Sequence, residues 1–125
     1  MPRFTGLAPV LLAPDVGEAL AYYRDVLGFE VQPYEHAPED YGYASRDGAV
    51  IHLAHADMCR PNSDLVGDLF DVYIWVDDVE AVHADLEQRG ANIIHGPTER
   101  PWGMREIRVR ELNGYVLGIG QPLET

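Results

Sequence analysis

Apolar residues recur at helical spacing in two segments of this chain, and the two segments begin and end alike. In the first, the apolar positions are Val16, Ala19, Leu20, Tyr23 and Leu27. Asp15 and Glu18 are spaced as an N-cap and its reciprocal partner, and Gly28 ends the pattern. This combination predicts a helix over 15–28.

The second helical segment repeats this arrangement. Its apolar face consists of Val79, Val82 and Leu86. Asp77 and Glu80 form the N-terminal pair, and Gly90 ends the segment. The pattern predicts a second helix over 77–90. Because the cap, the apolar spacing and the final glycine recur, the sequence indicates two similar units.

Runs typical of β-strands surround each predicted helix. The first helix is preceded by 7–13 and followed by 29–35, 41–46 and 49–55, and the second is preceded by 69–76 and followed by 91–95, 104–112 and 115–119. Asp47-Gly48 and Asn113-Gly114 are pairs that favour hairpin turns. The predicted order is βαβββ twice, which is an α+β class. We expect a single domain over 1–125 with modules at 5–57 and 69–122, joined by a connector at 57–68.

Alternation along the predicted strands separates a packing face from a second face. In 69–76, the packing face carries Phe70, Val72, Ile74 and Val76, and the second face carries Asp71, Tyr73 and Trp75. A carboxylate and two amphipathic rings are typical of a solvent-accessible ligand site. A buried dimer interface would show the same mixture of side chains, so both interpretations remain. In 49–55, Ile51 and Leu53 are predicted to pack, whereas His52 faces the other way as a ligand contact or as a hydrogen-bonded interior histidine.

Composition narrows the classes of partner. The 9 Lys+Arg and 21 Asp+Glu residues give a net charge of −12, which disfavours nucleic acid and anionic membranes and favours a cationic small molecule or a basic partner. The same acidity also serves solubility alone. Cys59 is the only cysteine, so no intrachain disulfide is expected, and we predict a cytoplasmic protein with no membrane span and no secretion signal.

Motifs for catalysis are sparse. The five histidines show no spacing typical of a metal-binding helix, and no glycine-rich phosphate loop precedes a helix. Cys59 stands next to Arg60, which could lower the thiol pKa, although an ordinary loop thiol is the simpler interpretation. Binding is therefore a better prediction than turnover.

Trp102 lies in the segment PWGMRE, between Pro101 and Gly103. Neither neighbour suits the interior of a helix or strand, so this segment is predicted to be a turn. The ring is then offered to a ligand or to a second subunit, because tryptophan is enriched at both kinds of site.

The segments 15–30, 76–91 and 101–122 together resemble the vicinal-oxygen-chelate superfamily, which includes glyoxalases, bleomycin-resistance proteins and extradiol dioxygenases. PWG-x-RE and the N-terminal APVL (8–11) are most similar to the bleomycin-resistance branch. The resemblance implies two cupped antiparallel or mixed sheets with helices outside. It also implies a ligand cavity within the cup, completed by a homodimer.

In the enzymes of this superfamily, four side chains inside the cup hold a metal. The resemblance places Ala8, His52, Asp71 and Gly118 at those positions. Ala8 and Gly118 have no ligating group, and transition metals need more than two protein ligands. We therefore expect no metal and no cofactor, with an atypical site at His52 and Asp71, helped by Glu106, as the alternative.

The resemblance also implies a set of binding residues. Trp102 corresponds to a ring-stacking tryptophan and Tyr73 to a cavity-facing aromatic residue, and Tyr34 and Tyr41 fall near aromatic positions beside the cleft. With Trp75, Asp71 and His52 they form the predicted ligand site. Pro9 resembles the proline at which related chains pass their first strand to a partner subunit.

The resemblance implies sequestration of a cationic aromatic compound, such as a bleomycin-type antibiotic, and the missing metal ligands indicate a function without metal or turnover. Flat rings would stack on the aromatic side chains, and a cationic tail would meet carboxylates. The alternatives are a glyoxalase-like or dioxygenase-like metalloenzyme with an atypical metal site, and a ligand-binding accessory subunit of a larger complex.

Overall fold

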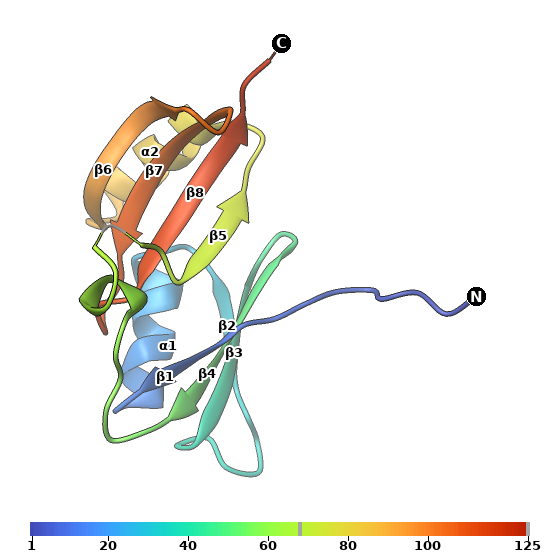
Figure 1. The fold of residues 1–125 in the computed structure, drawn as a ribbon. Helices are drawn as coiled ribbons and strands as arrows, with labels where there is room; N and C mark the ends of the chain where they lie inside the picture. The colour runs from blue at the N-terminus through green and yellow to red at the C-terminus, as the bar shows by residue number, and fades with distance from the viewer. Residues whose placement is uncertain (68, 125) are drawn as a thin grey trace.

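The computed structural model describes residues 1–67 and 69–124 and contains two four-stranded mixed sheets, each covered by one helix (Figure 1). The first sheet has the order β1-β4-β3-β2, where the strands are β1 (Val10–Ala13), β2 (Glu30–Pro33), β3 (Tyr41–Arg46) and β4 (Ala49–His55). β1 pairs with β4 in parallel, and the other pairs are antiparallel. Helix α1 (Val16–Asp25) packs across β2, β3 and β4.

The second sheet repeats this arrangement with the order β5-β8-β7-β6. Its strands are β5 (Val72–Trp75), β6 (Asn92–Arg100), β7 (Met104–Arg110) and β8 (Val116–Pro122), and helix α2 (Val79–Gln88) contacts β6, β7 and β8. The connector contains a short 3₁₀ helix, η1 (Asn62–Asp64). The predicted α+β fold of two βαβββ units is confirmed.

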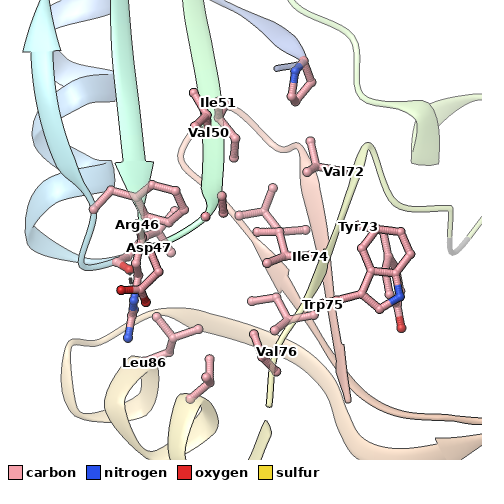
Figure 2. Close-up of a pocket in the computed structure, with 18 of the residues that line it drawn as sticks. Arg46, Asp47, Val50, Ile51, Val72, Tyr73, Ile74, Trp75, Val76 and Leu86 are labelled. Atoms are coloured by element: carbon pink, nitrogen blue, oxygen red, sulfur yellow. Dashed lines mark hydrogen bonds between the residues drawn. The ribbon is translucent and has the colours of Figure 1, made fainter. Parts of the chain in front are cut away.

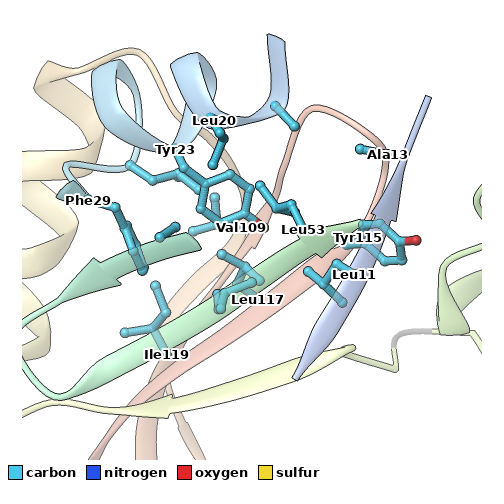
Figure 3. Close-up of a cluster of buried hydrophobic side chains, with 14 of the residues drawn as sticks. Leu11, Ala13, Leu20, Tyr23, Phe29, Leu53, Val109, Tyr115, Leu117 and Ile119 are labelled. Atoms are coloured by element: carbon cyan, nitrogen blue, oxygen red, sulfur yellow. The ribbon is translucent and has the colours of Figure 1, made fainter. Parts of the chain in front are cut away.

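Buried side chains from both sheets meet under α1 (Figure 3). Leu20 and Tyr23 of α1 pack toward Leu53 of β4. Leu117 of β8 belongs to the same cluster. The ring of Tyr23 meets Phe29 edge to face, with 5.5 Å between centroids. Because both modules contribute to one cluster, neither can be removed without exposing apolar surface of the other.

The two helices are capped by aspartates, and the second cap differs from the prediction. The Asp15 carboxylate accepts a hydrogen bond from the Glu18 amide at 2.9 Å, as predicted. In α2 the cap is Asp78, whose carboxylate accepts from the Ala81 amide at 3.1 Å, so the assignment of Asp77 was wrong. A capping carboxylate bonds the amide two or three residues later, and α2 begins at Val79, which puts Asp78 in register.

This difference gives a direct test. We expect Asp78→Ala to lower the free energy of unfolding by about 1 kcal/mol, because the first turn of α2 loses an acceptor. Asp77→Ala is the matched control and should change it by less than about 0.5 kcal/mol, since it leaves the cap intact. Urea unfolding of both variants measures this, and equal losses would contradict the assignment of Asp78.

Six strands differ in length from the prediction. β2 ends at Pro33 and β7 at Arg110, before the predicted ends at 35 and 112. β1 begins at Val10 and β5 at Val72, each three residues later than expected from 7–13 and 69–76. β6 continues to Arg100 and β8 to Pro122, past the predicted ends at 95 and 119. β6 passes the Gly96-Pro97 pair because register shifts between Ile93 and Thr98 absorb the interruption while pairing with β7 continues.

Both helices are short. α1 and α2 have 10 residues each, whereas a helix needs about 20 to cross the hydrocarbon core of a bilayer. Within residues 1–67 and 69–124, no helix is long and apolar enough to span a membrane.

Candidate functional site

Strand β5 separates an apolar face from an aromatic face (Figure 2). Val72, Ile74 and Val76 point toward Ile51 and Leu86, whereas Tyr73 and Trp75 project from the opposite face. The alternation inside the strand is therefore as predicted.

The prediction was wrong for Phe70. Its ring lies 5.0 Å from the ring of Tyr73, and the Arg108 guanidinium lies 5.4 Å from its ring centroid, so it belongs to the aromatic side. The two-residue period applies only from Val72, where β5 begins.

The centre of the aromatic face is the carboxylate of Glu106, which is fully buried on β7. Its Oε1 accepts hydrogen bonds from the Tyr73 hydroxyl at 3.0 Å and from the Trp102 indole N–H at 3.2 Å. Its Oε2 accepts from Arg108 Nε at 2.9 Å. Arg100 Nε lies 3.3 Å from the same Oε2, but in a geometry that makes an ion contact without a hydrogen bond. One buried carboxylate thus ties together three strands and the turn at 101–103.

These contacts present aromatic rings in defined positions. Trp102 is 54% exposed although its indole N–H is held by Glu106, and Trp75 is 69% exposed beside Tyr73, with ring centroids 5.3 Å apart. Burial, followed by the hydrogen bond to Glu106, raises the pKa of Tyr73 to about 12. Tyr73 is therefore a neutral hydroxyl donor at neutral pH, and the rings offer a rigid apolar surface with a polar anchor beneath it.

Two glycines of β8 make room for Tyr73. In the sheet register, Tyr73 stands opposite Gly118 and Trp75 opposite Gly120. A Cβ at Gly118 would lie 2.8 Å from Tyr73 Cδ1, and a Cβ at Gly120 would overlap the Tyr73 hydroxyl. The glycines therefore let the ring lie across β8 and reach Glu106.

A small basic pocket adjoins this network. It has a volume of about 120 Å³ and is lined by Ser63, Ile94, His95, Arg100, Arg108, Arg110 and Val116. Arg100 also places its guanidinium carbon 5.4 Å from the centroid of the Trp102 ring. The pocket and the aromatic face therefore share their arginines.

Two predicted residues of the first module, Tyr41 and His52, form a separate cluster. Tyr41 OH and His52 Nδ1 share a hydrogen bond of 2.9 Å on the first sheet. Tyr43, which sequence reasoning did not single out, meets the His52 ring edge to face with centroids 4.9 Å apart. Tyr34 lies beyond β2 and packs on His36. The first sheet thus has an aromatic cluster of its own.

Both oxygens of Asp71 accept hydrogen bonds from backbone amides. Oδ1 accepts from Asn62 at 2.8 Å, and Oδ2 accepts from Val116 at 2.8 Å. The carboxylate therefore ties the connector to the start of β8. A sequence pattern could not have indicated this, because the two donors come from distant segments.

A larger cavity of about 630 Å³ lies between the modules (Figure 2). Its apolar wall includes Val50, Ile51, Val72, Ile74, Val76 and Leu86. Of the predicted site residues, Pro9, Tyr73 and Trp75 contribute to its lining. His52, Asp71, Trp102, Tyr34 and Tyr41 lie outside it.

The four positions where the resemblance places metal ligands do not fit a metal. Ala8 and Gly118 have no donor, and Tyr73 lies over Gly118. The Asp71 carboxylate already accepts hydrogen bonds from two backbone amides. Of the four positions, only His52 on the other sheet then remains as a possible metal ligand. Within the described part of the chain, no group of three or more His, Cys, Asp or Glu side chains is placed to hold a metal ion.

Comparison with known proteins identifies the family. The model of the Glyoxalase/Bleomycin resistance protein/Dioxygenase superfamily matches residues 6–119. The chain is similar to TioX from Micromonospora sp. ML1, with 21% identity and a TM-score of 0.75 over 96% of this chain and 100% of that one. The bleomycin-binding protein from bleomycin-producing Streptomyces verticillus, solved with copper(II)-bleomycin, is 22% identical, with a TM-score of 0.70 and 100% coverage of both chains.

TnmS3, an antibiotic-binding protein from Streptomyces sp. CB03234, is 28% identical, with a TM-score of 0.68 over 98% of each chain. No curated protein matches the sequence. The family match extends over both sheets, and the solved relatives share the fold along nearly their whole length. The chain therefore belongs to the Glyoxalase/Bleomycin resistance protein/Dioxygenase superfamily.

Proposed function

We propose that this protein binds and sequesters an aromatic small molecule on the aromatic face of the second sheet, without a metal and without turnover. The observation that carries this proposal is the attachment of Tyr73 and Trp102 to one buried carboxylate, Glu106. Rings held in this way lose little conformational freedom when a ligand stacks on them. Trp75, which is 69% exposed, extends the same surface.

Two of the solved relatives support sequestration. One is a bleomycin-binding protein and another an antibiotic-binding protein, and both align along nearly all of this chain. The net charge of −12 favours capture of a cationic molecule, yet the aromatic face itself carries Arg100 and Arg108. The proposed ligand is therefore defined first by its aromatic rings. No contact in the site favours a metalloenzyme or an accessory subunit.

We also propose that a second copy of this chain completes the site. The segment before β1 projects away from both sheets (Figure 1) and carries the exposed side chains of Phe4 and Leu7. Val10 and Leu12 of β1 are exposed as well, directly after Pro9. Exchange of this arm at Pro9 would bury them against a partner. Light scattering at micromolar protein should give a dimer, and a monomer would contradict this part of the proposal alone.

Calorimetric titration tests the binding site. We expect metal-free or copper-loaded bleomycin, or the neutral probe naphthalene-2-carboxamide, to bind. For bleomycin we expect a Kd below about 1 μM, equivalent to about −8 kcal/mol. Trp102→Ala and Trp75→Ala should each weaken binding about tenfold, because each removes a stacking surface. Met58→Ala, which removes an exposed apolar side chain of the connector, is the matched control.

Two results would contradict the proposed site. If none of the three probes binds, the proposal that the protein sequesters an aromatic compound is contradicted. Binding that survives both tryptophan substitutions but is abolished by Val50→Trp would move the site to the 630 Å³ cavity, which Val50 lines.

A further inference from the structure

The basic pocket has an excess of positive charge in an otherwise acidic chain. Arg100 ends β6, Arg108 and Arg110 lie on β7, and His95 stands opposite Arg108 in the sheet register. The whole chain has 21 acidic residues against 9 basic ones. Nevertheless, among the residues that the structure describes, Glu106 is the only carboxylate paired with any of these three arginines.

Glu106 does not neutralise this cluster. It accepts one hydrogen bond from Arg108 and makes an ion contact with Arg100. Arg110 donates only to neutral acceptors in the described part of the chain, the Gly114 carbonyl at 2.8 Å and Ser63 Oγ at 3.4 Å. Three guanidinium groups therefore line the pocket, and the one carboxylate pairs with only two of them.

The burial of these groups makes the imbalance unfavourable in the absence of an anion. The Arg108 side chain is 8% exposed and the Arg100 side chain 22% exposed, and Arg100 Nε is buried without a hydrogen-bond acceptor. Buried charge and unsatisfied donors both raise the free energy of the folded protein unless a partner compensates them. A bound anion would supply that partner.

The position of the pocket indicates which molecule would bring the anion. Arg100 stacks on Trp102, and Arg108 stacks on Phe70, whose ring contacts Tyr73. The arginines and the aromatic face are therefore one continuous surface. At about 120 Å³ the pocket is much smaller than the roughly 300–1,000 Å³ typical of a whole ligand site, so it accommodates one substituent and leaves the rings outside.

We infer that the pocket lined by Arg100, Arg108 and Arg110 binds an oxyanion group, a carboxylate, sulfate or phosphate, carried by the aromatic ligand. This inference rests on the proposed function and specifies its ligand class. Guanidinium groups match such oxyanions because their N–H donors form paired, charge-assisted hydrogen bonds. The local charge of the site, and not the net charge of −12, then selects the ligand.

Matched probes test the inference. Calorimetric titration compares naphthalene-2-carboxylate with naphthalene-2-carboxamide, which has nearly the same shape and no charge. At constant ionic strength we expect the carboxylate to bind at least about tenfold more tightly. Arg110→Gln and Arg100→Gln should reduce that preference to less than about threefold. The control is Arg105→Gln, because Arg105 lies on the same strand but pairs with Glu80 of α2.

Inorganic sulfate tests the pocket without an aromatic ring. In a Trp75→Phe background, Trp102 is the only tryptophan, and its contact with Arg100 makes its fluorescence a reporter of the pocket. We expect sulfate to give a saturable change that chloride at equal ionic strength does not give. Adding Arg110→Gln should abolish the change, and adding Arg105→Gln should preserve it.

The two experiments separate the inference from the proposed function. Equal affinity for carboxylate and carboxamide would overturn the oxyanion pocket and leave the aromatic site standing. An arginine-dependent sulfate response without binding of either naphthalene compound would support the pocket and contradict the aromatic site. No response to sulfate and no binding of either compound would overturn both. A change from dimer to monomer in Arg110→Gln would assign the arginines to a partner's carboxylate and also overturn the inference.

Discussion

Replacing Glu106 with alanine is expected to lower the free energy of unfolding by about 3–5 kcal/mol. The side chain is fully buried, and its carboxylate pairs with Arg108, which is itself nearly buried. Removing it leaves an uncompensated guanidinium charge in the sheet and leaves the Tyr73 hydroxyl and the Trp102 indole without their acceptor. Equilibrium unfolding in guanidinium chloride measures the loss.

Two variants calibrate this expectation. Glu106→Gln retains an oxygen that can accept from Tyr73 and Trp102 but removes the charge, so we expect a smaller loss of about 1–3 kcal/mol. Glu80→Gln removes an exposed carboxylate that pairs with Arg105 on the other face of β7, and it should change stability by about 0–1 kcal/mol. A loss for Glu106→Ala no larger than that for Glu80→Gln would show that the buried network contributes nothing to stability.

The second large effect is expected at Gly120. Gly120→Ala should destabilise the protein by about 1–3 kcal/mol, because the new methyl group overlaps the Tyr73 hydroxyl and displaces the ring from Glu106. The same displacement should weaken binding of naphthalene-2-carboxamide, since Tyr73 is part of the aromatic face. Chemical denaturation and calorimetry measure the two effects separately.

A double-mutant cycle identifies the cause. In a Tyr73→Ala background the overlap is gone, so Gly120→Ala should be nearly neutral there, with a coupling of about 0.5–3 kcal/mol. Gly48→Ala is the matched control, because a Cβ at Gly48 meets nothing within 4 Å. Additive losses from Gly120→Ala and Tyr73→Ala would show that the glycine does not serve the ring.

Much of the fold could be predicted because its determinants are local. The helix at 15–28 follows from apolar spacing and from the cap at Asp15, and the structure places α1 inside those bounds. The packing of Ile51 and Leu53 follows from strand alternation, and both are buried. The cap of α2 was misassigned only because Asp77 and Asp78 are adjacent and either carboxylate satisfies the pattern.

The site could be predicted only in part. Tyr73, Trp75 and Trp102 were singled out from alternation and from the turn around Trp102. The carboxylate that organises them was not recognised as such, because Tyr73 and Glu106 are 33 residues apart. A signal was present in MREIRVR, where Glu106, Arg108 and Arg110 alternate with apolar residues and so share one face of a strand.

The sequence by itself determined the two helices and the order of the strands along the chain, because caps, turns and periodic apolar residues act over a few neighbouring positions. The family was indicated separately, by the resemblance of the segments 15–30, 76–91 and 101–122. Only the tertiary structure decided what the polar side chains contact. In the folded chain, Asp71 accepts hydrogen bonds from backbone amides, and the buried Glu106 accepts them from Tyr73 and Trp102. Three arginines line one pocket although the chain as a whole is acidic. The physical reason is that two charges compensate each other only when they lie close together in space. Strand pairing sets those distances, whereas the overall composition gives only the net charge of the chain.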